Sequence, residues 1–345
     1  MNINKFIPAF LLTIMFSLIA CEKEIDEHES DELLRLDAYV SIHYPEAIKT
    51  STGLYYIIYE EGDTESSLQP GNEDFVIFNY SGMDLEEYVF ETTNDSIAQL
   101  HDIYSSSTRY IPSFRQLKSS KNPLIAGLSE GLSLLKEGSK AKFLMPSSLA
   151  YGTTIYKGLN PYTSVIFDVE LIKVVTDPEA YEQELIDNYL IEFYPDAIID
   201  SILIDSVYFL TIIEQLAEDD DHSINGLYTQ PTDQEIFDDD IVSVNYQGRF
   251  LDDFLFDTNI QSVAEENNIY DDSRTYEPIK VTVGDSQYIE GFSVALRNLT
   301  TYTYAKIIIP SFFAYGETGT SSIPPYSPLI FELDVLGKKA SSTPD

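Results

Sequence analysis

The pentapeptide Gly127-Leu128-Ser129-Glu130-Gly131 has the spacing of a nucleophile elbow, in which a serine attacks an ester or amide carbonyl. Such a serine needs a buried strand before it and a histidine base later in the chain. Only His222 follows Ser129, and it lies in a strongly acidic stretch of the other half of the chain. The sequence therefore disfavours serine hydrolysis.

Residues that bind metals are present, but they are not spaced as a metal site. No histidine has a second ligand at zinc spacing, and the histidines lie far apart, at His28, His43, His101 and His222. Cys21 is the only cysteine, so no CxxC motif exists, and no acidic loop has the Asp-x-Asp-x-Asp-Gly spacing. An irregular calcium site stays open as an alternative. We expect no metal and no cofactor.

The chain is strongly acidic, with 58 acidic and 20 basic residues and a formal net charge of -38. Such a field repels phosphate backbones and anionic lipid headgroups, so we expect no nucleic-acid partner. The acidic clusters at 218–221 and 238–240 are typical of solvated loops. Because 43% of the residues are hydrophobic, the chain can still bury the cores of about two domains.

The first residues have the pattern of an export signal. Lys5 precedes an apolar run from Phe6 to Ala20, which is too short for a comfortable membrane span and indicates a signal peptide over residues 1–20. The run ends in Leu18-Ile19-Ala20-Cys21, which resembles the bacterial lipobox and predicts a lipid on Cys21. A buried cysteine after an uncleaved apolar segment is the alternative.

Residues 21–32 are too acidic and polar to pack, and we expect them to form a tether behind a lipidated Cys21. The stretch also resembles the acidic export signals of surface lipoproteins in Bacteroidetes-like bacteria. These features predict a lipid-anchored protein of the cell envelope, on the periplasmic or the surface-exposed face of the outer membrane.

The remaining sequence repeats itself over the length of a domain. Tyr39 followed by Tyr44-Pro45-Glu46-Ala47-Ile48 recurs as Tyr189 followed by Tyr194-Pro195-Asp196-Ala197-Ile198. Each copy starts with an amphipathic helical pattern, at 33–43 and 184–193, which the proline ends. We therefore predict domains at residues 33–176 and 177–338, followed by a tail at 339–345.

Strand patterns follow each of these helices. Segments 53–59 and 206–213 are rich in aromatic and β-branched residues, and Tyr80 and Tyr246 each share a strand face with alternate apolar residues. A short helix and a last apolar strand close each copy. This pattern predicts the α+β class, with two domains that each wrap a curved antiparallel sheet over a short helix and carry an N-terminal helix in front.

Five short motifs occur in the same order in both copies. In the second copy they are Tyr246-Gln247-Gly248, Phe256-Asp257-Thr258, Tyr288-Ile289-Glu290-Gly291-Phe292, Ala314-Tyr315-Gly316, and Ile323-Pro324-Pro325 leading to Phe331. In the first copy they are Tyr80-Ser81-Gly82, Phe90-Glu91-Thr92, Leu124-Ile125-Ala126-Gly127-Leu128, Ala150-Tyr151-Gly152, and Leu159-Asn160-Pro161 leading to Phe167. Each motif alone is weak, but the ordered set resembles the FKBP family of peptidyl-prolyl cis-trans isomerases.

The departures from the family pattern favour the second copy as the isomerase. The family's pocket tryptophan is Leu128 in the first copy and Phe292 in the second. The pocket aspartate is Glu91 in the first copy and Asp257 in the second. In the first copy, Asn160 stands where the family has the first proline of Ile-Pro-Pro. The second copy differs by a long acidic insertion at 263–272 and by the absence of a glycine after the short helix.

The resemblance implies an apolar pocket that grips a proline ring of a client protein and favours the twisted amide. In the second copy the Ile289 N–H and the Tyr315 hydroxyl would hold substrate carbonyls, and Asp257 would be a polar wall. The implied site residues of the second copy are Tyr246, Phe256, Asp257, Ile289, Phe292, Tyr315, Ile323 and Phe331. Those of the first copy are Tyr80, Phe90, Glu91, Ile125, Leu128, Tyr151, Leu159 and Phe167.

Two other functions remain open from the sequence. A non-catalytic lipoprotein of an envelope complex could use the same apolar clefts to bind peptide segments, and the missing tryptophan favours this alternative. A structural spacer would have no open cleft. Without the resemblance, aromatic residues on alternating strands are usually only core.

Overall fold

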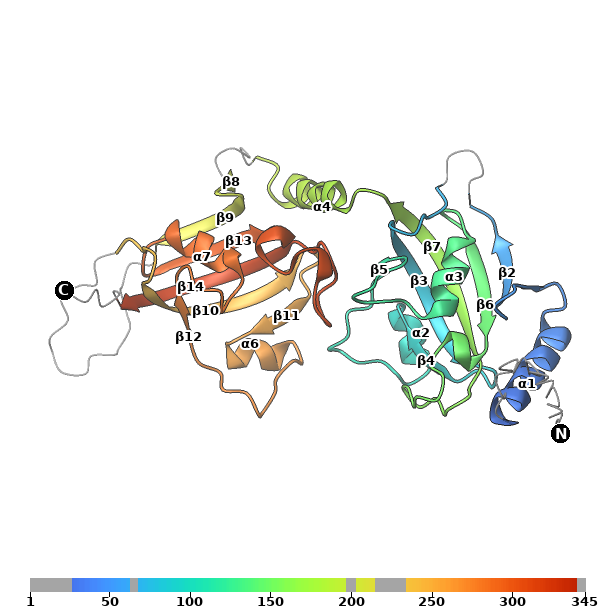
Figure 1. Ribbon diagram of the computed structural model, residues 1–345. Helices are drawn as coiled ribbons and strands as arrows, with labels where there is room; N and C mark the ends of the chain where they lie inside the picture. The colour runs from blue at the N-terminus through green and yellow to red at the C-terminus, as the bar shows by residue number, and fades with distance from the viewer. Residues whose placement is uncertain (1–26, 63–67, 197–202, 215–233, 340–345) are drawn as a thin grey trace, which may run out of the picture.

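The computed structural model describes residues 27–62, 68–196, 203–214 and 234–339 (Figure 1). The predicted signal peptide and the first half of the predicted tether, residues 21–26 with Cys21, lie outside these residues, as does the tail from residue 340. Within the described part of the chain, no helix has the length and apolar character that crossing a bilayer requires.

The first domain contains a seven-stranded antiparallel sheet within the described residues. Its strands are β1 (Ile48–Lys49), β2 (Tyr55–Glu60), β3 (Phe75–Asp84), β4 (Val89–Thr92), β5 (Ser113–Gln116), β6 (Lys140–Met145) and β7 (Val165–Val175). They lie in the order β1-β2-β6-β7-β3-β4, and β5 also pairs with β3. The central strands β3 and β7 form a long antiparallel pair.

The second domain repeats this sheet strand for strand. Its strands are β8 (Leu203–Ile204), β9 (Val207–Glu214), β10 (Ile241–Phe250), β11 (Leu255–Thr258), β12 (Ile279–Thr282), β13 (Thr303–Ile309) and β14 (Leu329–Lys339). Their order is β8-β9-β13-β14-β10-β11, with β12 on β10. The predicted α+β class and the two repeated antiparallel sheets are confirmed.

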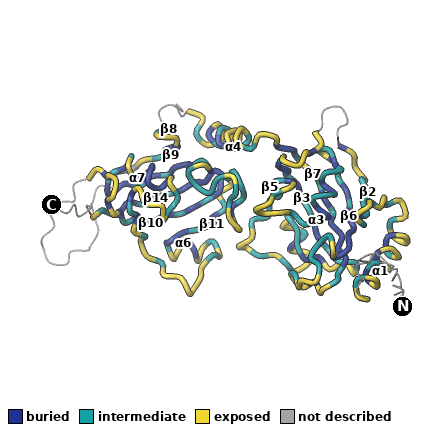
Figure 2. The backbone as a smooth tube through the Cα atoms, viewed as in Figure 1, coloured by how far each residue is buried: buried dark blue, intermediate teal, exposed yellow. Residues whose placement is uncertain are grey.

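A short helix packs on one face of each sheet. These helices are α3 (Ala126–Ser133) and α7 (Glu290–Arg297). Leu128 and Leu132 of α3 join the first core, and Phe292 and Leu296 of α7 join the second. Figure 2 shows that the buried backbone gathers in the two sheets and in these helices. Each domain therefore has its own apolar core beneath a helix.

A longer helix covers the other face of each sheet. It is α1 (Glu27–His43) in the first domain and α4 (Pro178–Phe193) in the second. Leu144 and Ile166 contact α1, whereas their strand neighbours Phe143 and Phe167 belong to the α3 core. Because successive strand residues point to opposite faces, α1 and α3 lie on opposite sides of the sheet.

A buried glutamate fastens each of these long helices to its sheet. Glu32 of α1 accepts hydrogen bonds from the Ser147 backbone N–H at 2.5 Å and from the Ser147 and Ser164 hydroxyls. Glu182 of α4 likewise accepts from the backbone N–H and the hydroxyl of Ser311, both at 2.5 Å. Ser147 and Ser311 start the 3-10 helices η1 (Ser147–Leu149) and η2 (Ser311–Phe313). The same carboxylate anchor thus occurs twice.

The long helices begin earlier than the sequence pattern indicated. Residues 27–32, which we expected in the tether, form the first turns of α1, because Glu32 finds buried hydrogen-bond donors despite its charge. The second long helix starts at Pro178 rather than at residue 184, with Asp177 as its N-cap accepting from the Ala180 N–H. The N-cap therefore places the start of α4 upstream of its amphipathic pattern.

Each domain also has a second short helix near the edge of its sheet. These are α2 (Asp95–Leu100) and α6 (Gln261–Glu266). The acidic insertion that we assigned to the second domain begins inside α6, and the first domain has the matching helix α2. The start of the acidic segment thus has a structural counterpart in the first domain, and the insertion at 263–272 relative to the family pattern stays a prediction.

The two domains contact each other through side chains and through α4, which Figure 1 shows above the gap between the sheets. The Arg109 guanidinium lies 3.9 Å from the Phe250 ring centroid, and its Nε is 2.8 Å from Asp252 Oδ2. On α4, the Tyr181 ring lies 5.7 Å from the Phe114 ring. The helix that anchors to the second sheet therefore also packs against the first domain.

Candidate functional site

In the second domain, four aromatic rings from three strands and a helix meet at one end of the core. Tyr246 lies on β10, Phe256 on β11, Phe331 on β14 and Phe292 on α7. The Phe331 centroid is 4.9 Å from Phe292, 5.8 Å from Phe256 and 6.3 Å from Tyr246. Phe292, the residue that the resemblance matches to the family's tryptophan, meets Tyr246 edge to face at 6.0 Å.

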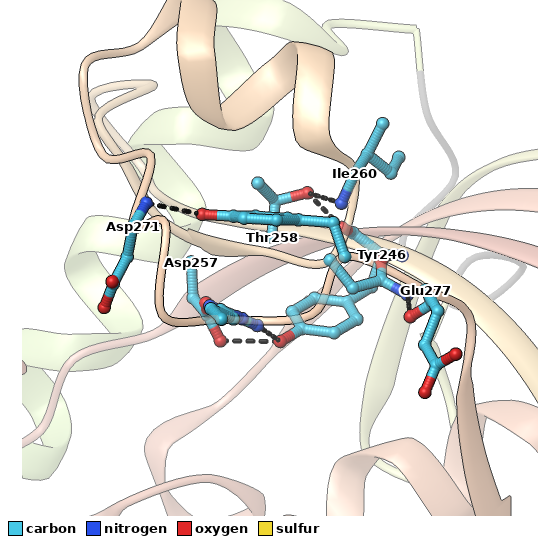
Figure 3. Close-up of polar contacts among 9 residues, drawn as sticks. Tyr246, Asp257, Thr258, Ile260, Asp271 and Glu277 are labelled. Atoms are coloured by element: carbon cyan, nitrogen blue, oxygen red, sulfur yellow. Dashed lines mark hydrogen bonds and ion pairs between the residues drawn. The ribbon is translucent and has the colours of Figure 1, made fainter.

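A polar network borders these rings. The Tyr246 hydroxyl donates to Asp257 Oδ2 at 2.6 Å, as Figure 3 shows. Arg274 pairs through Nη1 with Asp257 Oδ1 and donates from Nη2 to the Tyr246 hydroxyl oxygen at 3.0 Å. Burial, reinforced by the hydrogen bond to Asp257, raises the pKa of Tyr246. The tyrosine therefore stays a neutral donor, and the carboxylate is held in one orientation.

The residues after Asp257 fix the strand that carries it (Figure 3). The Thr258 hydroxyl donates to the Tyr246 carbonyl oxygen at 2.6 Å. Asn259 Oδ1 accepts from the Tyr246 N–H at 2.7 Å, and its Nδ2 donates to the Glu277 carbonyl oxygen at 2.9 Å. Because these groups are buried, the hydrogen bonds hold β11 and the chain near Arg274 firmly against β10.

The remaining predicted residues of the second domain border the same core. Ile289 directly precedes α7, so its N–H has no acceptor within that helix. Ile289 and Tyr315 are both partly buried against the core cluster that includes Ile323. Burial, and then the nearby Asp257 charge, raise the pKa of the Tyr315 hydroxyl, which remains a neutral donor. All eight predicted residues of the second copy thus lie around one core.

The glycine of the Tyr-x-Gly motif is explained by close packing. A Cβ on Gly248 would lie 2.6 Å from Cζ of Phe256 and 3.0 Å from the Phe331 ring. A Cβ on Gly82 would meet Phe90 and Phe167 at the same two distances. Since such contacts are too short for real atoms, only glycine allows the wall rings to press on the strand.

In the first domain, aromatic rings lie at similar positions, but one additional ring lies among them. Phe90 lies 5.8 Å from Phe167 and 5.7 Å from Tyr151, and Tyr80 lies 5.8 Å from Phe167. Tyr156, which no motif predicted, stacks on Tyr151 with centroids 4.0 Å apart and meets Phe90 edge to face. The Tyr156 ring therefore lies among the predicted pocket residues.

Glu91 has different partners from those of Asp257. It accepts hydrogen bonds from the hydroxyls of Tyr151 at 3.0 Å and Tyr156 at 2.8 Å, and it pairs with Lys157 at 2.8 Å. Burial, and then the Glu91 charge, raise the pKa values of both tyrosines. The longer side chain of glutamate thus ties together the loop after Ala150, whereas Asp257 holds Tyr246.

The other predicted residues of the first domain fall into the same cluster. Leu128 and Leu159 are buried in its core, and Ile125 packs against it from the position before α3. Ser129 lies inside α3 and donates to the Leu117 carbonyl oxygen at 2.8 Å, so it is not oriented as a nucleophile. Within the described ranges, no group of three or more histidine, cysteine or carboxylate side chains could hold a metal ion.

A model of the family described as "FKBP-type peptidyl-prolyl cis-trans isomerase" matches residues 66–172 and 232–336, which together exceed half of the chain. The chain belongs to the FKBP family. Each matched region covers most of one sheet and its short helix and leaves out the first two strands, β1 and β2 or β8 and β9, so the family assignment covers both domains.

Curated relatives agree with this assignment. FkpA of Escherichia coli strain K12, an FKBP-type peptidyl-prolyl cis-trans isomerase, is 36% identical over 135 residues, which cover 39% of this chain and 42% of that protein. Mouse peptidyl-prolyl cis-trans isomerase FKBP10 is 24% identical over 275 residues, covering 79% of this chain and 36% of that protein. The chain thus spans less than half the length of these relatives.

Solved structures of the family are also similar. The crystal structure of E. coli FkpA has 27% identity, a TM-score of 0.33, and coverage of 45% of this chain and 62% of that one. The structure of the three FKBP domains of wheat FKBP73 has 19% identity, a TM-score of 0.29, and coverage of 84% of this chain and 96% of that one.

Sequence reasoning missed the cations and one ring of the two FKBP sites. Arg274 lies two residues after the acidic stretch that we took for an insertion, where an isolated basic residue was the available signal. Tyr156 and Lys157 lie between two motifs and belong to neither. Because such side chains act from loops of variable sequence, motif order alone does not reveal them.

Proposed function

We propose that this protein catalyses the cis-trans isomerisation of prolyl peptide bonds in client proteins and that its second domain carries most of the activity. The chain belongs to the FKBP family, and we assign the isomerase reaction of that family to its second domain. The observation that carries it is the network of Tyr246, Asp257 and Arg274 beside the four-ring wall.

The reaction needs no bond cleavage. Rotation about a prolyl bond crosses a barrier of ~18–20 kcal/mol, because amide resonance must be broken. A dry apolar pocket favours the twisted amide, which is less charge-separated and less well solvated than the planar one. Phe256, Phe292 and Phe331 supply such walls, and the Ile289 N–H and Tyr315 hydroxyl are the donors for substrate carbonyls.

In this proposal, Asp257 is a polar group held in a fixed orientation beside the rotating bond, and it neither donates nor accepts a proton. Its two oxygens are engaged by Tyr246 and Arg274, so the carboxylate cannot turn away from the pocket. A pre-oriented polar group next to the rotating bond lowers the barrier without reorganisation during the reaction.

The first domain is proposed to bind peptides more than it catalyses. The Tyr156 ring lies in its ring cluster and Glu91 is drawn to the loop that carries Tyr156, so a proline ring would have to displace that side chain. This observation argues against catalysis at the ring cluster of the first domain.

We further propose that the protein is a lipoprotein of the cell envelope, with residues 1–20 as signal peptide and the lipid on Cys21. The support is the lipobox-like sequence before Cys21, which is the only cysteine of the chain. Cys21→Ser should move the protein from the detergent phase to the aqueous phase after Triton X-114 separation. Equal partitioning of both proteins would overturn the lipid anchor.

Isomerisation is tested with a proline-containing peptide and with a protein whose refolding is limited by proline isomerisation. The full chain should accelerate both reactions, and the Asp257→Ala, Tyr315→Ala double variant should lose most of the acceleration while keeping its circular dichroism spectrum. If the full chain does not exceed the uncatalysed rate, the catalytic proposal fails and peptide binding remains.

A further inference from the structure

A cleft of about 480 Å³ lies beside the first domain's site and is lined by both domains. Tyr80, Phe90 and Glu91 of that site form one side. The other side is part of the second domain's Ile-Pro-Pro loop, namely Thr320, Ser321, Ser322, Pro324 and Pro325. A peptide entering the first site would therefore contact the second domain as well.

The lining of this cleft is cationic in a protein with a formal net charge of -38. It contains Arg109, Arg115 and Lys157 against one carboxylate, that of Glu91. Lys157 pairs with Glu91, and Arg109 pairs with Asp252 of the second domain. Three positive charges against these two negative ones leave Arg115 uncompensated.

Arg115 is exceptional among the arginines, all six of which are described. The other five, Arg35, Arg109, Arg249, Arg274 and Arg297, each have a carboxylate oxygen within ion-pair distance. Arg115 donates from Nη2 only to Asn122, at 2.7 Å to the side-chain oxygen and 3.2 Å to the carbonyl oxygen. Its burial lowers its pKa, although a guanidinium keeps its charge in proteins.

The second domain shows that the fold does not need this charge. Arg115 pairs with Val76 on β3, and at the matching place Val281 pairs with Val242 on β10. Val281 is a core residue, 1% exposed. The first domain therefore has a partly desolvated cation, Arg115, where the second domain has Val281. A desolvated charge without a counter-ion is unfavourable.

We propose that this cleft binds client segments in which an acidic residue adjoins a proline, with the acidic carboxylate on Arg115 and the prolyl residue toward Tyr80 and Phe90. The guanidinium fork suits a carboxylate, which it can bind through two parallel hydrogen bonds. The inference rests on the proposed peptide binding by the first domain and adds the class of segment that it selects.

The test compares labelled peptides containing Glu-Pro, Gln-Pro or Glu-Ala in an otherwise identical sequence, measured by fluorescence anisotropy with the full chain. Glutamine matches glutamate in shape, so the Glu-Pro to Gln-Pro ratio reports the charge. Binding at 0.15 M salt confines the protein's overall field to about 8 Å. Glu-Pro should bind about tenfold tighter than Gln-Pro and than Glu-Ala, as expected for a hydrogen-bonded ion pair.

Arg115→Val, which installs the residue of the second domain, should remove the preference for Glu-Pro, and Arg115→Lys should keep part of it. Arg115→Gln serves if the valine variant melts at a lower temperature. Equal affinities of wild type for Glu-Pro and Gln-Pro would overturn the inference, as would a preference that survives in Arg115→Val. Equal binding of Glu-Ala would overturn the prolyl part.

These outcomes are independent of catalysis. A full chain without isomerase activity that still prefers Glu-Pro through Arg115 would contradict the proposed catalysis and support this inference. A full chain that isomerises prolyl bonds but shows no preference would do the reverse.

Discussion

The two domains have the same sheet, the same two helix layers and the same carboxylate anchor, but they use their pocket carboxylates differently. Asp257 holds Tyr246 and Arg274, whereas Glu91 holds Tyr151, Tyr156 and Lys157. The polar networks thus differ by one methylene group of the carboxylate and by the loop residues that bind it, Arg274 in one domain and Tyr156 and Lys157 in the other. The difference teaches that a duplicated fold can keep its packing while the polar contacts beside its two ring clusters diverge.

The shared architecture predicts the largest effect. Glu182→Ala should lower the free energy of unfolding of the second domain by about 2–4 kcal/mol, because it leaves the buried Ser311 N–H and hydroxyl without an acceptor. Glu32→Ala should cost the first domain a similar amount. Urea unfolding measures both. Glu192→Ala, on the exposed face of α4, is the control and should change the free energy of unfolding little. A loss as large as that of Glu182→Ala would show that Glu182 does not anchor the helix.

The packing of the two glycines gives the next effect. Gly248→Ala and Gly82→Ala should each destabilise their domain by about 1–3 kcal/mol, since the added methyl group meets a wall ring. The isomerisation rate should fall clearly only for Gly248→Ala. If Gly82→Ala reduces the rate as much as Gly248→Ala does, the functional asymmetry between the domains is wrong.

The divergent network predicts a catalytic effect. Asp257→Asn should reduce the isomerisation rate about tenfold, or about 1.4 kcal/mol of barrier, because Tyr246 and Arg274 lose their charged partner. Glu91→Gln should change the total rate less than twofold. Peptide isomerisation by the full chain measures both variants, and the opposite ranking would place the activity in the first domain.

Tyr156 offers a way to make the domains more alike. The second domain has Thr320 at the matching position, five residues after the Ala-Tyr-Gly tyrosine. Tyr156→Thr should remove the ring that stacks on Tyr151 and raise the affinity of the first cleft for proline peptides about fivefold, or about 1 kcal/mol. Nuclear magnetic resonance titration follows this; unchanged affinity would show that Tyr156 does not obstruct the cleft.

The smallest effect is a pH dependence. Burial raises the pKa of Glu182, against the two hydrogen bonds from Ser311. Because the folded chain then holds the proton more tightly than the unfolded chain, this group stabilises the second domain less as pH rises from about 4.5 through its folded pKa. The urea midpoint should show a decline of less than about 1.4 kcal/mol per pH unit that Glu182→Gln lacks. An identical pH profile for both proteins would contradict this.

The repeat, the α+β class and the aromatic walls could be predicted from the sequence because they rest on short motifs with fixed spacing. Tyr246, Phe256 and Phe331 are examples, since each lies on a strand whose alternation is visible. The helix starts could not be predicted, because Glu32 and Glu182 look like surface residues until Ser147 and Ser311 are seen beside them.

The cations of the clefts could not be predicted for a related reason. Arg274 and Arg115 act from segments whose sequence is dominated by other signals, acidic residues in one case and a strand in the other. Their roles depend on which side chain lies opposite in the folded chain, and that is a matter of strand register and loop closure.

The most direct test of the central claim is the isomerisation rate of the full chain with either site disabled. Asp257→Ala with Tyr315→Ala disables the second site, and Glu91→Ala with Tyr151→Ala disables the first. The account predicts that the second-site variant falls close to the uncatalysed rate, whereas the first-site variant keeps most of the wild-type rate. Full activity in the second-site variant would contradict the assignment of catalysis to the second domain.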